Sequence, residues 1–380
     1  MTGWTAVLAG ASATLLGIGL QRFAYGPILP AMVKDGWLAA GPAGMLGGAN
    51  LAGYLVGAFA AGMVARACGM LAALRGAMLL SVLGFALCTI PGGFWWFLPW
   101  RVLAGFTGGV LMVLAGPAVQ AVVPPERRGL ASGLVITGVG IGIMAGAALV
   151  PLALPWGLSA TWLALAGVAA LLTVLAWPYW PRVPPPGPAP GGGAGLARGA
   201  ALFIVVYGLS GLAASPHMVF WPDYIVRGLG QGTAAGAAWW LVFGIGTCLG
   251  GVLLGRAADR FGAQAALRFG LVLQAFGTGL PLLGHGPVVL ALSSLAAGAT
   301  VLGITVLALV RARGFGAEAG PRVWRLATGV WGAATAAAGF GLSWLLTATG
   351  GHLPLFACGF AAALAALALS VLAENPTSAP

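Results

Sequence analysis

The chain has 380 residues, of which 60% are hydrophobic and only 6% are charged, with a formal net charge of +11. A soluble protein needs more charge on its surface than this, so the composition excludes a soluble globular domain and indicates a membrane as the solvent. The positive charge could indicate a nucleic-acid partner, but the arginines lie in short loops between apolar runs. We therefore expect a lipid bilayer as partner and no nucleic acid.

Twelve apolar segments are long enough to cross a bilayer, for which a helix needs about 20 residues. They predict an all-α polytopic membrane protein with twelve transmembrane helices. The first segment lacks the basic start and cleavage site of a signal peptide, so we expect it to remain as a helix. The twelve are Trp4–Pro30, Gly41–Val64, Met70–Ile90, Trp95–Val122, Gly129–Leu154, Leu158–Tyr179, Gly199–Val226, Gly232–Ala257, Gln264–Gly284, Pro287–Val310, Val323–Ala348 and Leu353–Ala373.

Residues 181–198 are rich in proline and glycine and separate six apolar segments from six. This composition is typical of a linker rather than a folded domain. The pairs Leu29-Pro30 and Trp221-Pro222 stand at matching places in the two halves. We therefore expect two pseudo-symmetric six-helix bundles, at residues 1–180 and 199–380, with a site where the repeats meet.

Basic residues are divided unequally between the two sets of loops. One set holds only Lys34 and Arg227, whereas the other holds thirteen arginines. Since cytoplasmic loops carry the excess of lysine and arginine, we expect the arginine-rich loops, the linker and both termini in the cytoplasm. The thirteen are Arg66, Arg75, Arg127, Arg128, Arg182, Arg198, Arg256, Arg260, Arg268, Arg311, Arg313, Arg322 and Arg325.

One short polar turn, Gly255-Arg256-Ala257-Ala258-Asp259-Arg260-Phe261-Gly262, lies between two long apolar runs. A degenerate copy begins at Gly62 and ends at Gly69, with Arg66 where the acid belongs. The pattern Gly-x-x-x-Asp-Arg-x-Gly resembles the cytoplasmic-loop signature of the major facilitator superfamily of transporters. The resemblance implies a gating role for Gly255, Asp259, Arg260 and Gly262, with Asp259 holding helices 8 and 11 together.

Two further stretches indicate one particular branch of this superfamily. They are the run from Gly19 to Met32, which contains Gln21-Arg22-Phe23-Ala24-Tyr25-Gly26-Pro27, and the run from Ala49 to Gly57. Together they look like the YbfB/YjiJ-type branch of the same superfamily, which comprises bacterial inner-membrane transporters. The resemblance covers most of the chain and implies the fold, transport by alternating access and a bacterial inner membrane, but no substrate.

Arg22 and Arg101 are the two arginines that remain after those assigned to the loops are counted. An arginine at the centre of a spanning helix costs about 2.5–3.5 kcal/mol on insertion scales, so each should face a wet cavity or a partner. The alternatives are snorkelling to head groups for Arg22 and an interfacial position for Arg101. Arg101 begins Arg-x-x-x-Gly-x-x-x-Gly with Gly105 and Gly109, and these glycines should clear one helix face for close packing against a neighbouring helix. This resembles the superfamily's fourth-helix motif, whose arginine handles substrate or proton.

Four further residues are candidates for substrate binding. Asn50 and Tyr54 are one helical turn apart and share a face; they can bind substrate or form interhelical hydrogen bonds. His217 aligns with Tyr25 when the halves are matched on their prolines. It can act as a proton carrier or be a satisfied, neutral core histidine. With the two arginines, these side chains form the expected substrate site.

The acidic residues all fall in loops or at helix ends, so no carboxylate relay inside the membrane is expected. They are Asp35, Glu126, Asp223, Asp259, Glu318 and Glu374. Two intramembrane arginines without intramembrane acids form a positive cavity, which attracts an anion. Arginine also matches a carboxylate through its planar fork.

The leading hypothesis is therefore a secondary transporter for a small organic anion or polar metabolite. The alternative is a proton-coupled multidrug exporter of apolar compounds, favoured by many aromatic residues and by Gly133, Gly142 and Gly146, which partly resemble the fifth-helix motif of drug exporters. Protons remain a candidate coupling ion. Scattered cysteines and histidines and the lack of catalytic motifs predict no metal, no cofactor and no enzymatic activity, and we expect a monomer.

Overall fold

The computed structural model describes residues 3–185, 196–316 and 319–372. Within these residues all regular structure is helical, and twelve helices are long and apolar enough to cross a membrane. Both observations confirm the predicted fold class. Most of the expected linker, residues 186–195, lies outside the described part, as do Glu318 and Glu374 among the acids.

The spans follow the predicted order, with short 3₁₀ and π segments at several ends. The main elements are α1 (Gly3–Thr14), η1 (Leu15–Leu20), α2 (Tyr25–Lys34), α3 (Ala40–Cys68), α4 (Met70–Leu87), α5 (Gly93–Gln120), α6 (Arg128–Ala153), α7 (Leu158–Ala176), α8 (Arg198–Asp223), η5 (Tyr224–Gly228), α9 (Gly232–Phe261), α10 (Ala263–Leu283), α11 (Pro287–Arg313), α12 (Ala319–Thr349) and α13 (Leu353–Leu372). The 3₁₀ segments are η2 (Pro125–Arg127), η3 (Leu154–Trp156) and η4 (Trp177–Tyr179).

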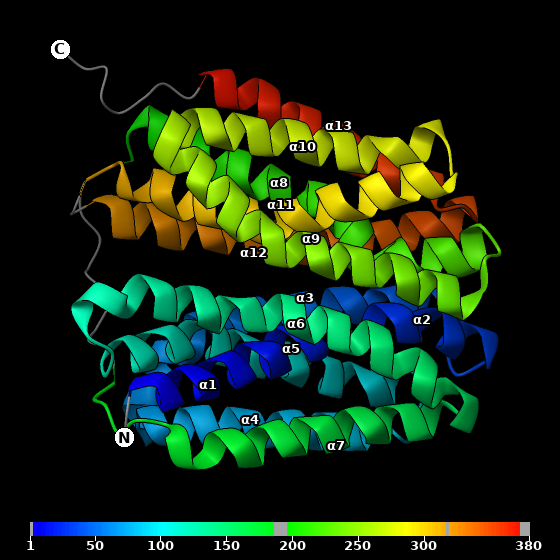
Figure 1. The fold of residues 1–380 in the computed structure, drawn as a ribbon. Coiled ribbons are helices and arrows are strands. Elements are labelled where there is room, and N and C mark those ends of the chain that lie inside the picture. Colours follow the sequence, from blue (N-terminus) through cyan, green and yellow to red (C-terminus); the bar gives the residue numbers. More distant parts are fainter. Residues whose placement is uncertain (1–2, 186–195, 317–318, 373–380) are drawn as a thin grey trace.

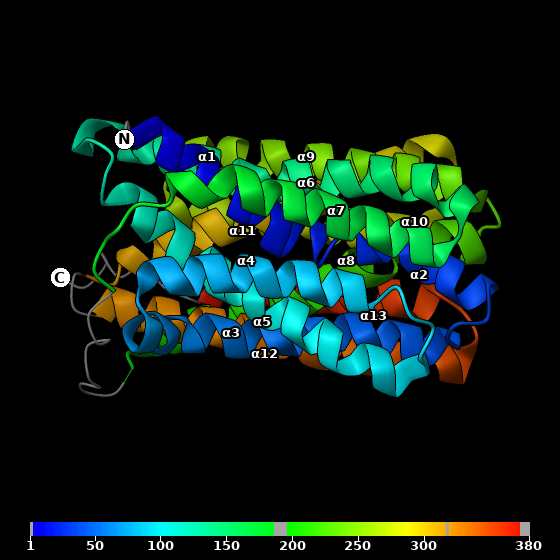
Figure 2. The same ribbon diagram turned by 90° about the horizontal axis from the view of Figure 1, so that it is seen from below.

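Helices α1–α7 lie on one side of the molecule and α8–α13 on the other, and we call these groups the first and second bundles (Figure 1). Viewed from below, the helices of the first bundle run side by side between two opposite faces (Figure 2). The starts of α1 and α8 and the ends of α7 and α13 share one of them, which we call the linker face; the opposite one is the far face. One hydrophobic core belongs to the first bundle, while a second crosses the boundary between the bundles.

Glycines allow the helices within each bundle to pack backbone against backbone. A Cβ atom at Gly105 would overlap the carbonyl oxygen of Asn50, and one at Gly57 would overlap that of Phe106. The α3–α5 contact therefore depends on small residues, as the Arg101 motif predicts. In the second bundle, a Cβ at Gly298 would overlap the carbonyl of Phe243 in the same way, so α9 and α11 repeat this arrangement.

The duplicated turns also repeat in three dimensions. Gly69 ends α3 with φ +89° and ψ 150°, and Gly262 ends α9 with φ +84° and ψ 151°. Each donates its N–H to the carbonyl four residues earlier, Ala65 or Ala258. A positive φ is strained for residues with a side chain, so glycine is required at both places.

The first span is not one continuous helix, in contrast to the expected Trp4–Pro30. It runs as α1 and then as the π-helix η1, breaks into a turn at residues 21–24, and resumes as α2. Pro27 explains the break, because a proline has no N–H to bond the carbonyl of residue 23 and its ring clashes there. The freed carbonyl of Phe23 instead accepts a hydrogen bond of 2.9 Å from Trp240 Nε1 in the second bundle.

The two bundles are closed against each other near the far face. There α3 packs on α12, where Gly48 and Gly339 meet so closely that a Cβ on Gly48 would lie 3.0 Å from the Gly339 carbonyl carbon. On the same side α2 packs on α8, and a Cβ on Gly26 would lie 3.2 Å from Cγ of Pro222. The bundles therefore pack closely against each other at Gly48 and Gly26, on the far-face side of the boundary, in this state.

Candidate functional site

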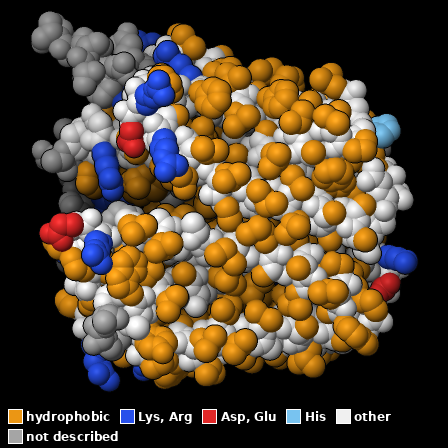
Figure 3. Space-filling model, in the orientation of Figure 1, with side chains coloured by type: hydrophobic (Ala, Val, Ile, Leu, Met, Phe, Trp, Pro, Cys, Tyr) orange, Lys and Arg blue, Asp and Glu red, His pale blue; other side chains and the backbone are white. Residues whose placement is uncertain are grey.

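A cavity of about 630 Å³ separates the bundles on the linker-face side. It lies between the end of α3 and the start of α12, and we call it the linker-face cavity. Hydrophobic side chains cover the middle of the molecule, while arginines gather around the hollowed end (Figure 3). Its described lining residues include three arginines and no carboxylate: Tyr54, Leu55, Ala58, Phe59, Gly62, Met63, Arg66, Val113, Arg322, Trp324, Arg325, Leu326 and Thr328.

Arg22 stands at the inner end of this cavity, beside one of its lining residues. Its guanidinium carbon lies 4.6 Å from the ring centroid of Tyr54 and 5.9 Å from that of Trp331 in α12. These are cation–π distances, which hold the charge between aromatic faces. The turn at residues 21–24 places this side chain at the boundary between the bundles, in accord with the prediction that Arg22 faces a cavity.

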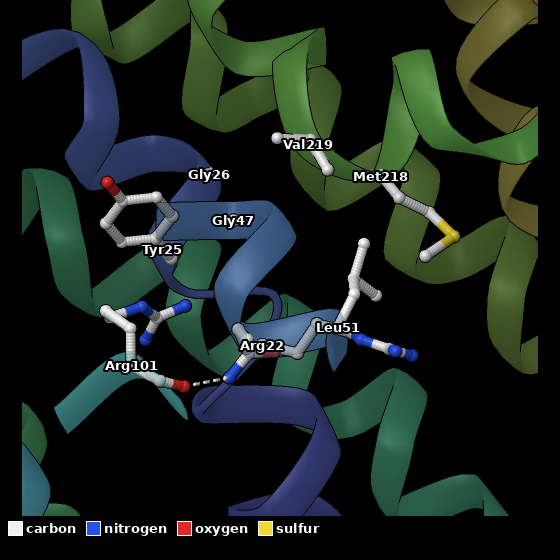
Figure 4. A pocket seen from close by; sticks show the side chains of 9 residues that line it. Arg22, Tyr25, Gly26, Gly47, Leu51, Arg101, Met218 and Val219 are labelled. Atoms are coloured by element: carbon white, nitrogen blue, oxygen red, sulfur yellow. Dashed lines mark hydrogen bonds between the residues drawn. The ribbon is translucent and has the colours of Figure 1, made fainter. Parts of the chain in front are cut away.

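A much smaller cavity, of about 10 Å³, lies deeper and is lined by the two intramembrane arginines (Figure 4). Its volume is about that of one water molecule. We call it the central cavity. It is lined from the first bundle by Arg22, Tyr25, Gly26, Gly47, Asn50, Leu51 and Arg101, and from α8 of the second bundle by Met218 and Val219.

Arg101 is 2% exposed and is held in place by three neighbours. Its Nη1 donates a 2.9 Å hydrogen bond to the carbonyl oxygen of Gln21, which the broken helix leaves available. Its guanidinium carbon lies 4.2 Å from the ring centroid of Tyr25. The Asn50 amide donates to the Arg101 carbonyl at 3.3 Å, the bond drawn as a dashed line in Figure 4. The interfacial alternative for Arg101 is therefore wrong.

Four buried guanidinium nitrogens of Arg22 and Arg101 form no hydrogen bond within the described chain. They are Nε and Nη2 of Arg22 and Nε and Nη2 of Arg101. Buried donors are almost always satisfied, and orphaned ones in a native structure need an explanation. Cations whose donors lack protein acceptors are suited to bind an anionic oxygen group, which can accept several charge-assisted hydrogen bonds at once.

Five of the six predicted substrate-site residues thus come together, and His217 does not. Its ring points away from the central cavity, into the second bundle, where it lies 4.5 Å from the Trp221 ring and 5.1 Å from the Phe356 ring. Its Nε2 is 2.9 Å from Ser293 Oγ. Because that hydroxyl donates its proton to the Gly277 carbonyl, it accepts from His217, which assigns the Nε2–H tautomer. His217 is therefore a core histidine.

Sequence reasoning missed Asp223. The residue ends α8 as expected, but the span continues through η5 to Gly228, and the carboxylate is completely buried with Arg227 and His352 as partners. The expected position at a helix end is therefore right, whereas the burial of this carboxylate inside the second bundle was not expected. The Trp221-Pro222-Asp223 sequence followed four residues later by Arg227 is a helical ion-pair spacing that could have indicated it.

The predicted gating residues lie at the linker face, apart from both cavities. Asp259 is exposed and has no partner among the described residues, while the Arg260 guanidinium lies 5.4 Å from the Phe261 ring. Across the bundle boundary α9 packs on α6, whereas α12 packs on α3. Asp259 belongs to α9, the eighth span, and α12, the eleventh span, lies in the same bundle. The expected link between these two helices at Asp259 stays a prediction.

The two-bundle arrangement and the twelve spans define a class of polytopic membrane transporters. A crystal structure of a D-xylose–proton symporter shares the fold, with a TM-score of 0.69 and 15% sequence identity over 96% of this chain and 97% of that chain. At this identity the likeness shows the fold alone.

The sequence family described as "Uncharacterised MFS-type transporter YbfB" matches residues 14–372, and the chain belongs to this family. No curated protein matches the chain. The chain is therefore a multi-pass membrane transporter of the major facilitator type and not an enzyme.

Proposed function

We propose that this protein is a secondary transporter of a small organic anion whose carboxylate binds between Arg22 and Arg101. The observation that carries the proposal is the set of four unpaired, buried guanidinium nitrogens that belong to residues lining one cavity. A carboxylate supplies two acceptor oxygens to such donors. Tyr54 and Trp331, beside Arg22, offer flat apolar surfaces to the rest of the molecule.

The anion reaches this site through the linker-face cavity. Arg66 lines its mouth, and a cationic side chain at a cleft raises the local concentration of anions. Applying the excess of basic residues in loops to this fold, we infer that the linker face is cytoplasmic in a bacterial inner membrane. The structure then corresponds to the state open to the cytoplasm.

Transport requires that the two bundles rock about the central cavity, so that the far-face contacts at Gly48 and Gly339 separate while the linker-face cavity closes. The bundles at residues 1–180 and 199–380 act as the rigid bodies of this motion. We infer that Asp259 then approaches the basic start of α6 and stabilises the closed linker face. An Asp259→Asn variant that cycles at the wild-type rate would exclude this role.

The experiment that tests the substrate class compares matched ligands that differ only in charge. Purified protein is heated with benzoate or with benzamide, which has nearly the same shape but no charge. A ligand at 100 times its Kd stabilises the folded state by about 2.7 kcal/mol. We expect stabilisation by benzoate and related carboxylates, little by the amides, and loss of the carboxylate effect in Arg22→Gln. Equal stabilisation by both ligands contradicts the proposal.

One observation favours a second function, the proton-coupled export of apolar compounds. The walls of the linker-face cavity between its arginines are apolar, with Leu55, Phe59, Met63, Val113 and Leu326 among them. Such walls suit drug-like molecules. A deletion strain that becomes sensitive to several unrelated apolar compounds, together with purified protein that ignores carboxylates, would select this function.

A further inference from the structure

A buried ionic cluster lies at the far-face end of the second bundle, outside the central cavity. Asp223 is fully buried, and Arg227 donates hydrogen bonds from Nε and Nη2 to its two carboxylate oxygens. His352, which lies between α12 and α13, has its Nε2 2.7 Å from Asp223 Oδ2. The cluster therefore connects the end of the seventh span to the start of the twelfth.

Asp223 is the only buried acid in the described part of the chain, since Asp35, Glu126 and Asp259 are exposed. Ionisable groups inside membrane spans are costly and mark ion or proton pathways. Arg227 neutralises the Asp223 carboxylate, so the cluster already has a balanced pair. Histidine is the side-chain type that exchanges protons in the physiological range, which makes His352 the proton-accepting member.

Few other ionisable groups face this cluster. On η5 the Tyr224 ring lies 5.8 Å from the His352 ring, and α2 contributes Tyr25, whose hydroxyl donates to the Ala43 carbonyl. The far-face halves of α3, α9, α10, α11 and α12 bring no Asp, Glu, Lys, Arg or His, and α13 carries none along its length. No competing charge from these helices therefore stands between His352 and Asp223.

The other charged or titratable groups of this side of the molecule are placed elsewhere, and His285 lies in the exposed loop between α10 and α11. His217, six residues earlier on α8, is bound to Ser293. Lys34 and Asp35, at the end of α2, line a far-face cavity of about 550 Å³ together with Arg227. This cavity lies between α2 and η5, so the far-face surface is already hollowed next to the cluster.

The cluster is connected to the central cavity by one turn of a single helix. Val219 lines the central cavity, and Asp223 follows it by four residues on α8. Between them Pro222 contacts Gly26 of α2, the residue after Tyr25. Opening of the far face must separate α2 from α8 at this contact. The same movement opens the central cavity and changes the burial of Asp223.

We propose that the His352–Asp223 pair is the binding site of a coupling proton that travels with the anion. Neutral His352 donates its Nε2–H to Asp223; a proton added at Nδ1 gives an imidazolium and leaves the Asp223–Arg227 pair intact. The added positive charge lies near the anion site, so proton and anion favour each other's binding, and the effect is reciprocal. The coupling rests on the proposed function, whereas the proton site does not.

The test uses the full-length protein in nanodiscs with ¹⁵N-labelled histidine, because the chain has only three histidines and each gives its own pair of ring signals. We expect the His352 signals to change from the neutral tautomer to imidazolium as the pH falls from 9 to 4. In Asp223→Asn the ring signals of His352 should respond to pH differently, because the carboxylate in contact with its Nε2 is gone. A neutral His352 throughout, or an unaltered Asp223→Asn response, overturns the proton site.

A binding measurement tests the coupling. Benzoate should bind wild-type protein about five-fold or more tightly at pH 5.5 than at pH 8, in the range usual for coupled sites. This difference should vanish in His352→Gln and persist in His285→Gln, a matched change at an exposed loop histidine. If the His352 signals respond to pH as expected but benzoate does not bind wild-type protein, the anion proposal fails and the proton site stands. Benzoate binding with equal pH dependence in wild type and His352→Gln overturns the coupling.

Discussion

The two intramembrane arginines are equally unusual in a spanning helix but are held in different ways. Arg101 has a hydrogen bond to the Gln21 carbonyl and an aromatic face beneath it, so its position is fixed before any ligand arrives. Arg22 is held by aromatic faces alone, with two nitrogens unpaired. We interpret Arg101 as the fixed part of the site and Arg22 as the part whose interactions are completed by the anion.

Replacing Arg22 with methionine should separate function from stability. The change removes a buried cation that no carboxylate of the described residues neutralises and keeps an apolar side chain of similar length, so the free energy of unfolding should rise by about 1–2 kcal/mol. Carboxylate affinity should fall about 10- to 100-fold, the loss expected for a charge-assisted hydrogen-bonded contact. Thermal unfolding and ligand titration measure both; Arg22→Lys is the control that keeps the charge.

The same replacement at Arg101 should have the opposite effect on stability. Arg101→Met leaves the Gln21 carbonyl without its donor inside the membrane, which costs about 1–3 kcal/mol. The variant should therefore unfold at a lower temperature than wild type and also lose carboxylate binding. A stability gain in Arg101→Met would show that the bond to Gln21 is not what fixes this side chain.

Glycine determines how closely the helices approach one another. On α5, a Cβ at Gly105 would overlap the backbone of α3, whereas one at Gly116 would meet nothing within 4 Å. The same helix thus offers a tight position and an open one. The break in the first span acts at this level too, because it turns the carbonyls of Gln21 and Phe23 toward donors on other helices.

The pair Gly105→Ala and Gly116→Ala tests this packing. Gly105→Ala should force α3 and α5 apart and lower the free energy of unfolding by about 1–3 kcal/mol, the usual cost of overpacking. Gly116→Ala should be neutral or stabilise by up to about 1 kcal/mol, because alanine loses less entropy in a helix. Unfolding curves in detergent measure both changes. Equal effects of the two variants on the free energy of unfolding would show that stability does not depend on the close α3–α5 contact at Gly105.

As a whole, the molecule is closed at the far face and open at the linker face. Contacts between the bundles at Gly48 and Gly339 are backbone to backbone, while the linker-face ends of α3 and α12 enclose the cavity of about 630 Å³. Packed interfaces switch between discrete arrangements rather than deform continuously. A bulky side chain in the far-face contact should therefore shift the population of molecules toward the state in which the far face is open and the linker face is closed.

Cysteine labelling measures this shift. In a background without the four native cysteines, Met63→Cys lies on the cavity wall and should react with a membrane-impermeant thiol reagent applied at the linker face. Leu171→Cys, on an exposed apolar position of α7, is the control that should not react, because the thiolate forms only in water. Adding Gly48→Val should slow the labelling of position 63 several-fold; unchanged labelling contradicts the rocking motion.

The sequence was sufficient for the twelve spans, for the glycine contacts of α3 and α5, and for the meeting of Arg22, Tyr25, Asn50, Tyr54 and Arg101. These follow from hydropathy, residue size and the cost of buried charge, which act locally along a helix. The break at residues 21–24 was not predicted, because its carbonyls are satisfied by Trp240 and Arg101, which are distant in sequence. Asp223 was misjudged because His352, which stabilises it, is 129 residues away.

The most direct test of the account is uptake of radiolabelled benzoate into proteoliposomes that contain wild-type protein, Arg22→Gln or Asp259→Asn, with protein-free liposomes to subtract passive entry. We predict saturable uptake by wild type that unlabelled benzoate suppresses and benzamide does not, and uptake at the protein-free level for Arg22→Gln. Uptake by Arg22→Gln at the wild-type rate, or competition by benzamide as strong as by benzoate, would contradict an anion path through the central cavity.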